Sequence, residues 1–311
     1  MYTRLLIPLD GSKLAEQILP YTRFLARSLK IPVELLEVID PEVIGALSGS
    51  KQGRLADIVG RPADIVLAEK KQASLSYLGA TARSFLSPEV KCVAESGKPE
   101  DVVIERAAAD RGTLIAMTTH GRSGLQRWLL GSVTEKVLRG STNHLLVVRA
   151  SDEPQTRSEA EFKRVLVPLD GSEIAEKVLP YAVDLAGKMR LEVILIRTYM
   201  LPPSVAAEDY GSYLGEFTEA LEAEAREYVG AKVKELKAKG LENVSSVVEF
   251  GFPAEKIIEL AQKIPDNFVA MCTHGRSGIK AWALGSVTER VVRHSGDPVL
   301  VIRATSGRPS S

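Results

Sequence analysis

The sequence predicts an α/β protein of two tandem doubly wound domains, each a five-stranded, mainly parallel sheet with helices on both faces. Three observations lead to this prediction. The 311-residue chain is long enough for two domains of ordinary size. It repeats itself at a distance close to half its length. Within each copy, short apolar runs alternate with helical patterns, which is typical of parallel βαβ units.

The repeat shows in two blocks. Residues 3–21 and 163–181 share 12 of 19 positions at an offset of 160, and residues 117–149 and 271–303 share 20 of 33 at an offset of 154. The second copy is therefore six residues shorter in its middle. A unit of this length is a domain and not one turn of a solenoid. We predict a first domain over 1–149, a polar linker over 150–162, a second domain over 163–303 and a tail over 304–311.

Each copy is predicted to alternate five strands with helices. The strands are predicted at Arg4–Pro8, Val33–Ile39, a run ending at Gly97, Thr113–Thr118 and Leu145–Arg149, and at Arg164–Pro168, Glu192–Thr198, a run ending at Gly251, Phe268–Cys272 and Val299–Arg303. A helix is indicated after the first strand by Leu14, Ile18, Leu19, Phe24 and Leu25. Another, over about 217–239, is rich in Glu, Ala and Lys. In such sheets ligands bind beyond the carboxyl ends of the strands, where the strand order reverses.

Composition excludes several classes of protein. Lys plus Arg and Asp plus Glu are both 40, so the chain lacks the excess positive charge of a nucleic-acid or anionic-membrane binder. No apolar run reaches the ~18 residues of a membrane helix, and the start MYTRLLIPLDG does not read as a secretory signal. Two cysteines give no disulfide framework. We therefore expect a cytoplasmic protein with no membrane or nucleic-acid partner.

The sharpest motif follows the fourth strand of each copy. It is a Thr-His-Gly-Arg-Ser-Gly run, with nine residues between its first glycine and a later Gly-Ser, so the pairs are Gly121 with Gly131 and Gly275 with Gly285. The helix that follows opens with Ser-Val-Thr-Glu, which has the spacing of a capping box. The loop therefore leads directly into a helix N-terminus.

A helix start of this kind suits a phosphate, because it exposes unpaired backbone N–H groups and the positive end of the dipole. Glycines let the backbone approach an anion, and Arg122 or Arg276 can pair with phosphate oxygens. The alternative is that the glycines only turn the chain and the serines only cap helices. Retention of the whole loop in both copies, while the middles diverge, favours the phosphate site.

A second motif ends the first strand of each copy, as Pro-Leu-Asp-Gly-Ser. The carboxylates of Asp10 and Asp170 can accept hydrogen bonds from a ribose hydroxyl or an adenine amino group, and the alternative is a helix N-cap. Strands one and four are expected to be neighbours, so both motifs would share one crevice. This convergence favours a nucleotide.

Other chemistries find little support. The spacing of His120, His274, Cys92 and Cys272 matches no metal site, and Cys272 is expected to lie in the sheet and not to act as a nucleophile. No GxxxxGK[ST], GxGxxG or GxSxG motif occurs.

With these motifs the sequence resembles a tandem universal stress protein, with one family domain in each copy. The family's ATP-binding signature is Gly, two residues, Gly, nine residues, then Gly and Ser or Thr. Here the second glycine is Gly121 or Gly275, and Thr118 or Cys272 stands in place of the first.

The resemblance implies a nucleotide-binding set in each copy. The strand-one residues would line the adenosine, Val38 would face the adenine, Met117 and Thr118 would edge the ribose, and the glycine loop would hold the phosphates. The two sets are Pro8, Leu9, Asp10, Val38, Met117, Thr118, Gly121, Arg122, Gly131, Ser132 and Val133, and Pro168, Leu169, Asp170, Thr198, Met271, Cys272, Gly275, Arg276, Gly285, Ser286 and Val287.

The resemblance also implies a function: binding of ATP, or of AMP or ADP, by a stress-response sensor or signalling module. Mg²⁺ would be held by phosphates and water. The family's pairing through fifth strands implies self-association of the two halves and a homodimer. The phosphate loop has no carboxylate to activate water, so fast catalysis is not expected, and slow ATP hydrolysis stays open. The alternative is a nucleotide-free, chaperone-like scaffold of the same fold.

Overall fold

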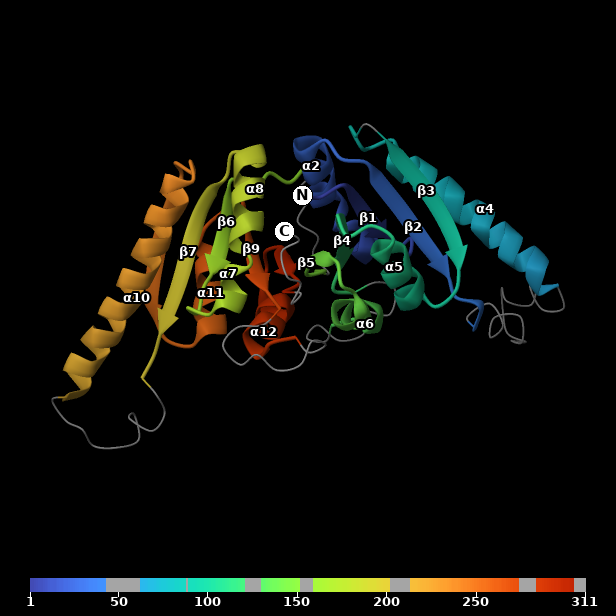
Figure 1. The fold of residues 1–311 in the computed structure, drawn as a ribbon. Helices are drawn as coiled ribbons and strands as arrows, with labels where there is room; N and C mark the ends of the chain where they lie inside the picture. Colours follow the sequence, from blue (N-terminus) through green and yellow to red (C-terminus); the bar gives the residue numbers. More distant parts are fainter. Residues whose placement is uncertain are drawn as a thin grey trace. The chain divides into compact units, whose positions relative to one another are not determined.

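The structure, a computed structural model, describes residues 1–42, 62–87, 89–120, 130–151, 159–201, 213–273 and 284–304. They form two compact units, one built mainly from each copy of the repeat (Figure 1). The elements of the first half are β1 (Arg4–Pro8), α1 (Lys13–Glu16), α2 (Leu19–Leu29), β2 (Val33–Ile39), α4 (Ala63–Ala82), β3 (Val90–Ser96), α5 (Pro99–Ala108), β4 (Thr113–Thr118), α6 (Ser132–Gly140) and β5 (His144–Val148).

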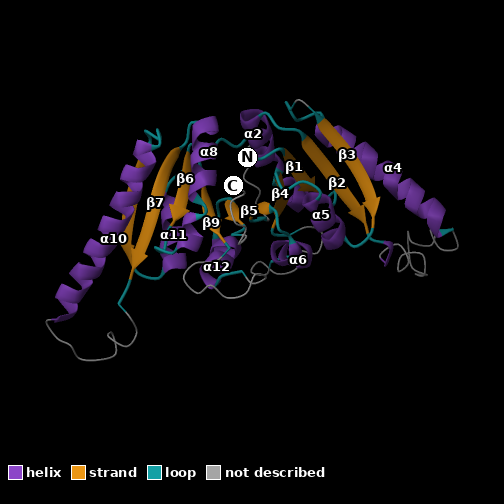
Figure 2. Cartoon of the chain, viewed as in Figure 1, coloured by secondary structure: helices purple, strands orange, loops and turns teal. Residues whose placement is uncertain are grey.

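The second half repeats this order of strands and helices (Figure 2). Its elements are β6 (Arg164–Pro168), α7 (Glu173–Glu176), α8 (Leu179–Met189), β7 (Glu192–Tyr199), α10 (Tyr213–Ala238), β8 (Val244–Phe250), α11 (Pro253–Lys263), β9 (Asn267–Cys272), α12 (Ser286–His294) and β10 (Val299–Ile302). The α/β prediction is confirmed. Within the described ranges, no helix combines the length and apolar character needed to cross a bilayer.

The strand order explains where a ligand could bind. It is β3-β2-β1-β4-β5 in the first half and β8-β7-β6-β9-β10 in the second. In the first half β1 pairs in parallel with β2 on one side and β4 on the other, and in the second half β6 does so with β7 and β9. The expected adjacency of strands one and four is confirmed. The order reverses at this point, so a crevice forms beyond the carboxyl ends of these strands.

The sheets are buried because helices cover both faces. In the first half α4 packs on β2 and β3, whereas α5 packs with α6 and against β4. Figure 1 shows α4 and α5 on opposite sides of β2 and β3, as right-handed crossovers in a doubly wound sheet require. Strands covered on both faces carry continuous apolar runs, and Leu5, Leu6 and Ile7 of β1 are fully buried.

One predicted helix is divided in the structure. The apolar pattern from Leu14 to Leu25 indicates a single helix after β1, but α1 ends at Glu16 and α2 begins at Leu19. Pro20 lies in the first turn of α2 and has no N–H to donate to a carbonyl one turn earlier, so the helix restarts there. The second half has the same break before Pro180.

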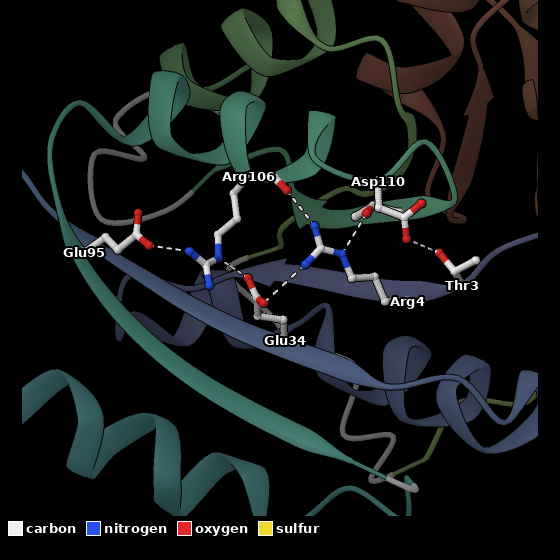
Figure 3. Close-up of polar contacts among 7 residues, drawn as sticks. Thr3, Arg4, Glu34, Glu95, Arg106 and Asp110 are labelled. Carbon is white, nitrogen blue, oxygen red and sulfur yellow. Dashed lines mark hydrogen bonds and ion pairs between the residues drawn. The ribbon is translucent and has the colours of Figure 1, made fainter.

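A buried ion cluster lies under α5 in the first half (Figure 3). Glu34 of β2, whose side chain is only 6% exposed, pairs with Arg106 and with Arg4 at 3.3 Å. Arg106 also pairs with Glu95, and Arg4 donates to Thr113 Oγ1 at 2.8 Å. The hydrogen bond to Glu34 raises the pKa of the Arg106 guanidinium above its usual value.

The second half carries an apolar pair at the matching positions. The sheet registers align Glu34 with Ile194, and the helix starts at Pro99 and Pro253 align Arg106 with Leu260. The same place in the fold is therefore filled by a charged pair in one half and by an apolar pair in the other.

Candidate functional site

The Asp-Gly-Ser turn after the first strand has the same geometry in both halves. Asp10 Oδ1 accepts from the Ser12 N–H at 2.9 Å, and Asp170 Oδ1 accepts from the Ser172 N–H at 3.0 Å. Each serine is the N-cap of the next helix, and Ser12 Oγ accepts from the Ala15 N–H at 3.1 Å. The cap is thus the serine, and the aspartate holds the turn that presents it.

The glycine of this turn has a backbone reason to be glycine. Gly11 has φ 76° and Gly171 has φ 84°, in the left-handed region that other residues rarely adopt. The turn brings each aspartate to the carboxyl end of its strand, in the crevice of the switch point.

The predicted capping box at the other motif is wrong. Gly131 is the N-cap of α6 and Ser132 is the first helical residue, so the N-cap residue itself has no side chain that could accept a hydrogen bond. The Glu135 carboxylate forms an ion pair with Arg139 at 3.0 Å, whereas in a capping box it would accept from the backbone N–H of the N-cap residue. The second half repeats this, with Gly285 as the N-cap of α12. A glycine cap contributes no side-chain acceptor to the first N–H groups of α6 and α12.

Two hydrogen bonds fix each of these helix starts to the end of the fourth strand. The Gly131 N–H donates to Thr119 O at 2.7 Å, and Thr134 Oγ1 donates to Thr118 O at 2.8 Å. In the second half the Gly285 N–H and Thr288 Oγ1 make the matching bonds, at 2.7 and 2.8 Å. The helix N-terminus is therefore held rigidly beside the strand end.

The first of these bonds also gives Gly131 a structural role. A Cβ at Gly131 would lie 2.7 Å from the Thr119 carbonyl oxygen, which is too close for any side chain. The glycine is therefore required by the chain's own backbone, whether or not an anion approaches it.

In the second half these parts surround a cavity of about 450 Å³, within the range of small-molecule sites. All of the predicted second-half residues that the structure describes line it: Pro168, Leu169, Asp170, Thr198, Met271, Cys272, Gly285, Ser286 and Val287. They come from the ends of β6, β7 and β9 and from the start of α12. The structure thus brings them together around one space, and their binding role stays a prediction.

The first-half residues occupy the corresponding places. Pro8 ends β1, Leu9 and Asp10 follow it, Val38 lies near the end of β2, and Met117 and Thr118 end β4. Gly131, Ser132 and Val133 form the start of α6. Four predicted phosphate-loop residues, Gly121, Arg122, Gly275 and Arg276, lie outside the described residues.

Cys272 lies in the sheet, as predicted. It ends β9, is 4% exposed and lies with its Sγ 3.6 Å from Ala175 O. Burial raises the pKa of this thiol to about 12, so it is protonated at neutral pH. Its counterpart Thr118 is also buried and donates from Oγ1 to His120 O at 2.7 Å. Each is thus a neutral wall of the crevice.

Sequence reasoning missed part of the cavity wall. Two helices close the cavity, through Leu221, Glu224 and Ala225 of α10 and through Pro253 and Ile257 of α11. These helices contain no motif, so only their predicted position beside the second strand could have suggested them. The buried Arg197 was missed too, although it directly precedes the predicted Thr198.

Comparison with known proteins identifies the family. The profile of the Universal stress protein family matches residues 1–149 and again residues 161–303. The chain belongs to the universal stress protein family. It is a tandem member, because the profile matches once in each copy of the repeat.

Individual universal stress proteins agree with this assignment. One from Methanocaldococcus jannaschii is 30% identical over 142 residues, which are 46% of this chain and 82% of that protein. One from Mycolicibacterium smegmatis is 22% identical over 304 residues, which are 96% of both chains. The crystal structure of one from Archaeoglobus fulgidus aligns over 96% of both chains with a TM-score of 0.58 at 24% identity, which supports the shared fold.

Proposed function

We propose that this universal stress protein binds adenine nucleotides, ATP or AMP and ADP, at the switch point of each half and acts as a nucleotide-dependent sensor or signalling module. The observation that carries the proposal is the second-half cavity, which joins the ends of β6, β7 and β9 to the exposed start of α12. Family membership supports it, and both copies keep the later part of the family's ATP-binding signature, which is Gly, nine residues, then Gly-Ser.

The two ends of the cavity differ in chemistry. At the α12 end, the first backbone N–H groups of the helix and the helix dipole favour a phosphate. At the other end, Leu169, Thr198 and Met271 form a largely apolar wall that suits a base and ribose. A Mg²⁺ ion would be carried by the phosphates and water, with no dedicated protein cage.

The proposal favours binding over fast hydrolysis. Asp170 lines the cavity, but its Oδ1 accepts from the Ser172 N–H and also from Ser172 Oγ at 2.6 Å. This carboxylate is engaged in holding the turn, and Cys272 is protonated. A cytoplasmic location and self-association of the chain belong to the same proposal.

The test is to titrate the purified chain with ATP and to measure the heat of binding. Ser286→Glu places a carboxylate at the first position of α12, where the dipole favours it for the helix but where it repels a phosphate. We expect ATP affinity at the second site to fall by at least about tenfold, or ~1.4 kcal/mol. Ser286→Gln, of the same size without the charge, is the control, and Ser132→Glu tests the first site.

Two results would contradict the proposal. One is the absence of binding heat with the wild-type chain after any co-purified ligand has been removed, which would favour the nucleotide-free scaffold. The other is unchanged affinity in the Ser132→Glu, Ser286→Glu double variant while its melting temperature equals that of the control. In that case the helix starts do not hold the phosphates.

A further inference from the structure

The two halves carry opposite charges at one position of the second strand. The registers pair Pro8 with Leu36 and Pro168 with Ile196, so the next residues, Glu37 and Arg197, correspond. Glu37 is half-buried, and Arg197 is 8% exposed. At this position the second half has a donor-only guanidinium where the first half has an acceptor-only carboxylate.

Arg197 lines the second-half cavity and is held in place by the protein. Its Nη1 lies 3.4 Å from Leu169 O, and its Cζ lies 5.4 Å from the ring centroid of Tyr228 on α10. Tyr228 in turn donates to Glu176 Oε1 at 2.8 Å. The guanidinium is therefore oriented before any ligand arrives, between the ends of β6 and β7.

The first half also has a half-buried tyrosine near Glu37, but its hydroxyl is not held as that of Tyr228 is. Burial of Tyr77 on α4, together with the negative charges of Glu16 and Glu37, raises the pKa of its hydroxyl. Glu16 and Glu176 hold the same place, at the ends of α1 and α7. The tyrosine and the glutamate are kept while the charge at the strand position changes sign, but the Tyr77 hydroxyl is buried without a hydrogen-bond partner among the described residues, whereas the Tyr228 hydroxyl donates to Glu176.

The strand order places Arg197 at the base end of a bound nucleotide. β6 lies between β9 and β7, so the end of β7 is two strand spacings, or about 10 Å, from the end of β9 beside α12. A nucleotide with its phosphates at the start of α12 would span that distance and bring its base to β7. Thr198, the next residue, also lines the cavity and adds a hydroxyl where the first half has Val38.

The exchange of Glu for Arg changes which base edge is favoured. A carboxylate accepts hydrogen bonds from an exocyclic amino group, as adenine carries at position 6. A guanidinium donates to a 6-oxo group and the neighbouring ring nitrogen N7. We propose that Arg197 makes the second-half pocket favour 6-oxopurine nucleotides over adenine nucleotides, whereas the first-half pocket, with Glu37, favours adenine. This inference rests on the proposed nucleotide binding and specifies its base selectivity.

The test compares ATP with inosine triphosphate, which carries a 6-oxo group in place of the 6-amino group. Both are titrated into the Ser132→Glu chain, in which the first site is expected to be weakened so that the second site dominates the binding heat. We expect inosine triphosphate to bind at least about fivefold more tightly than ATP. Arg197→Glu, which copies the first half, reverses the preference, and Arg197→Gln brings the ratio close to one. Glu37→Arg in the Ser286→Glu chain shifts the first site toward inosine triphosphate.

The outcomes separate the two proposals. Binding of both nucleotides with equal affinity, or a preference for ATP that Arg197→Gln leaves unchanged, overturns the selectivity and leaves nucleotide binding intact. If the role of Arg197 were purely structural, its substitution would lower the affinities for both nucleotides together without changing their ratio. This result would also overturn the selectivity. No heat with either nucleotide overturns nucleotide binding by the second half, and the selectivity falls with it. The wild-type ratio needs no substitution at Arg197, so the test does not depend on how its variants fold.

Discussion

The ion cluster under α5 gives a stability prediction whose control is already present in the chain. Replacing Glu34 by Ile and Arg106 by Leu copies the second half, where Ile194 and Leu260 stand at these positions. We expect each single substitution to be costly and the pair together to be nearly neutral, because an isolated buried charge costs far more than an apolar pair.

The magnitudes follow from exposure. Arg106→Leu leaves the Glu34 carboxylate, whose side chain is 6% exposed, with Arg4 alone, so we expect a loss of about 3 kcal/mol in the free energy of unfolding. Glu34→Ile leaves two guanidinium groups that are each 22% exposed, and Arg106 keeps Glu95, so we expect about 2 kcal/mol. The double variant should lie within about 1 kcal/mol of the wild type, because Arg4 keeps Thr113 as a partner.

The assay must resolve the two halves, because two units need not unfold together. Hydrogen exchange followed by mass spectrometry does so peptide by peptide. Peptides covering β1 and β2 should lose protection in the single variants and regain it in the double variant, while peptides covering β6 and β7 stay unchanged. Additive losses in the double variant would refute the reasoning, since the pair would then stabilise the fold well beyond an apolar replacement.

Three further predictions concern the turns, the buried thiol and the glycines. Ser12→Ala and Ser172→Ala each remove the acceptor for the third residue of a helix, and urea denaturation should show a loss of about 1 kcal/mol for each. Cys272, with a pKa of about 12, is about one part in ten thousand thiolate at pH 8, so iodoacetamide should label the half-buried Cys92 first; faster labelling of native Cys272 would contradict its burial. Gly131→Ala should destabilise the chain through contact with the Thr119 carbonyl, whereas Gly79→Ala, in open space within α4, should stabilise it by about 0.5–1 kcal/mol. Thermal unfolding of the two glycine variants checks the opposite signs.

Sequence alone was sufficient where local pattern and fold agree. The strands Arg4–Pro8, Val33–Ile39 and Thr113–Thr118 were predicted with the bounds that the structure has, because buried parallel strands are short apolar runs that end at turn residues. The adjacency of strands one and four follows from the strand order of a doubly wound sheet, and it brings the described residues of the predicted second-half set around one cavity.

Sequence reasoning failed where tertiary contacts decide the role of a residue. Ser132 and Glu135 have capping-box spacing, but the bond from the Gly131 N–H to Thr119 O fixes the helix start one residue earlier and makes the glycine the cap. The cavity wall from α10 was not predicted because Leu221 and Ala225 follow ordinary helical periodicity, and only packing shows that they face a space. Arg197 interrupts an apolar strand, and this interruption was the signal that could have found it.

The retained and diverged parts of the two crevices suggest a division of work within the site. The starts of α6 and α12 are anchored in the same way in both halves, because the Gly131 N–H and the Gly285 N–H each donate to a carbonyl oxygen at 2.7 Å. The phosphate groups are the same in every nucleotide, whatever its base, so one arrangement of the backbone can bind all of them. At the proposed nucleotide sites the base would be read by side chains of the second strand, and there Glu37 and Arg197 differ in the sign of their charge. Under the proposed selectivity, the sign of the charge at this strand position sets which purine nucleotide each duplicated site favours.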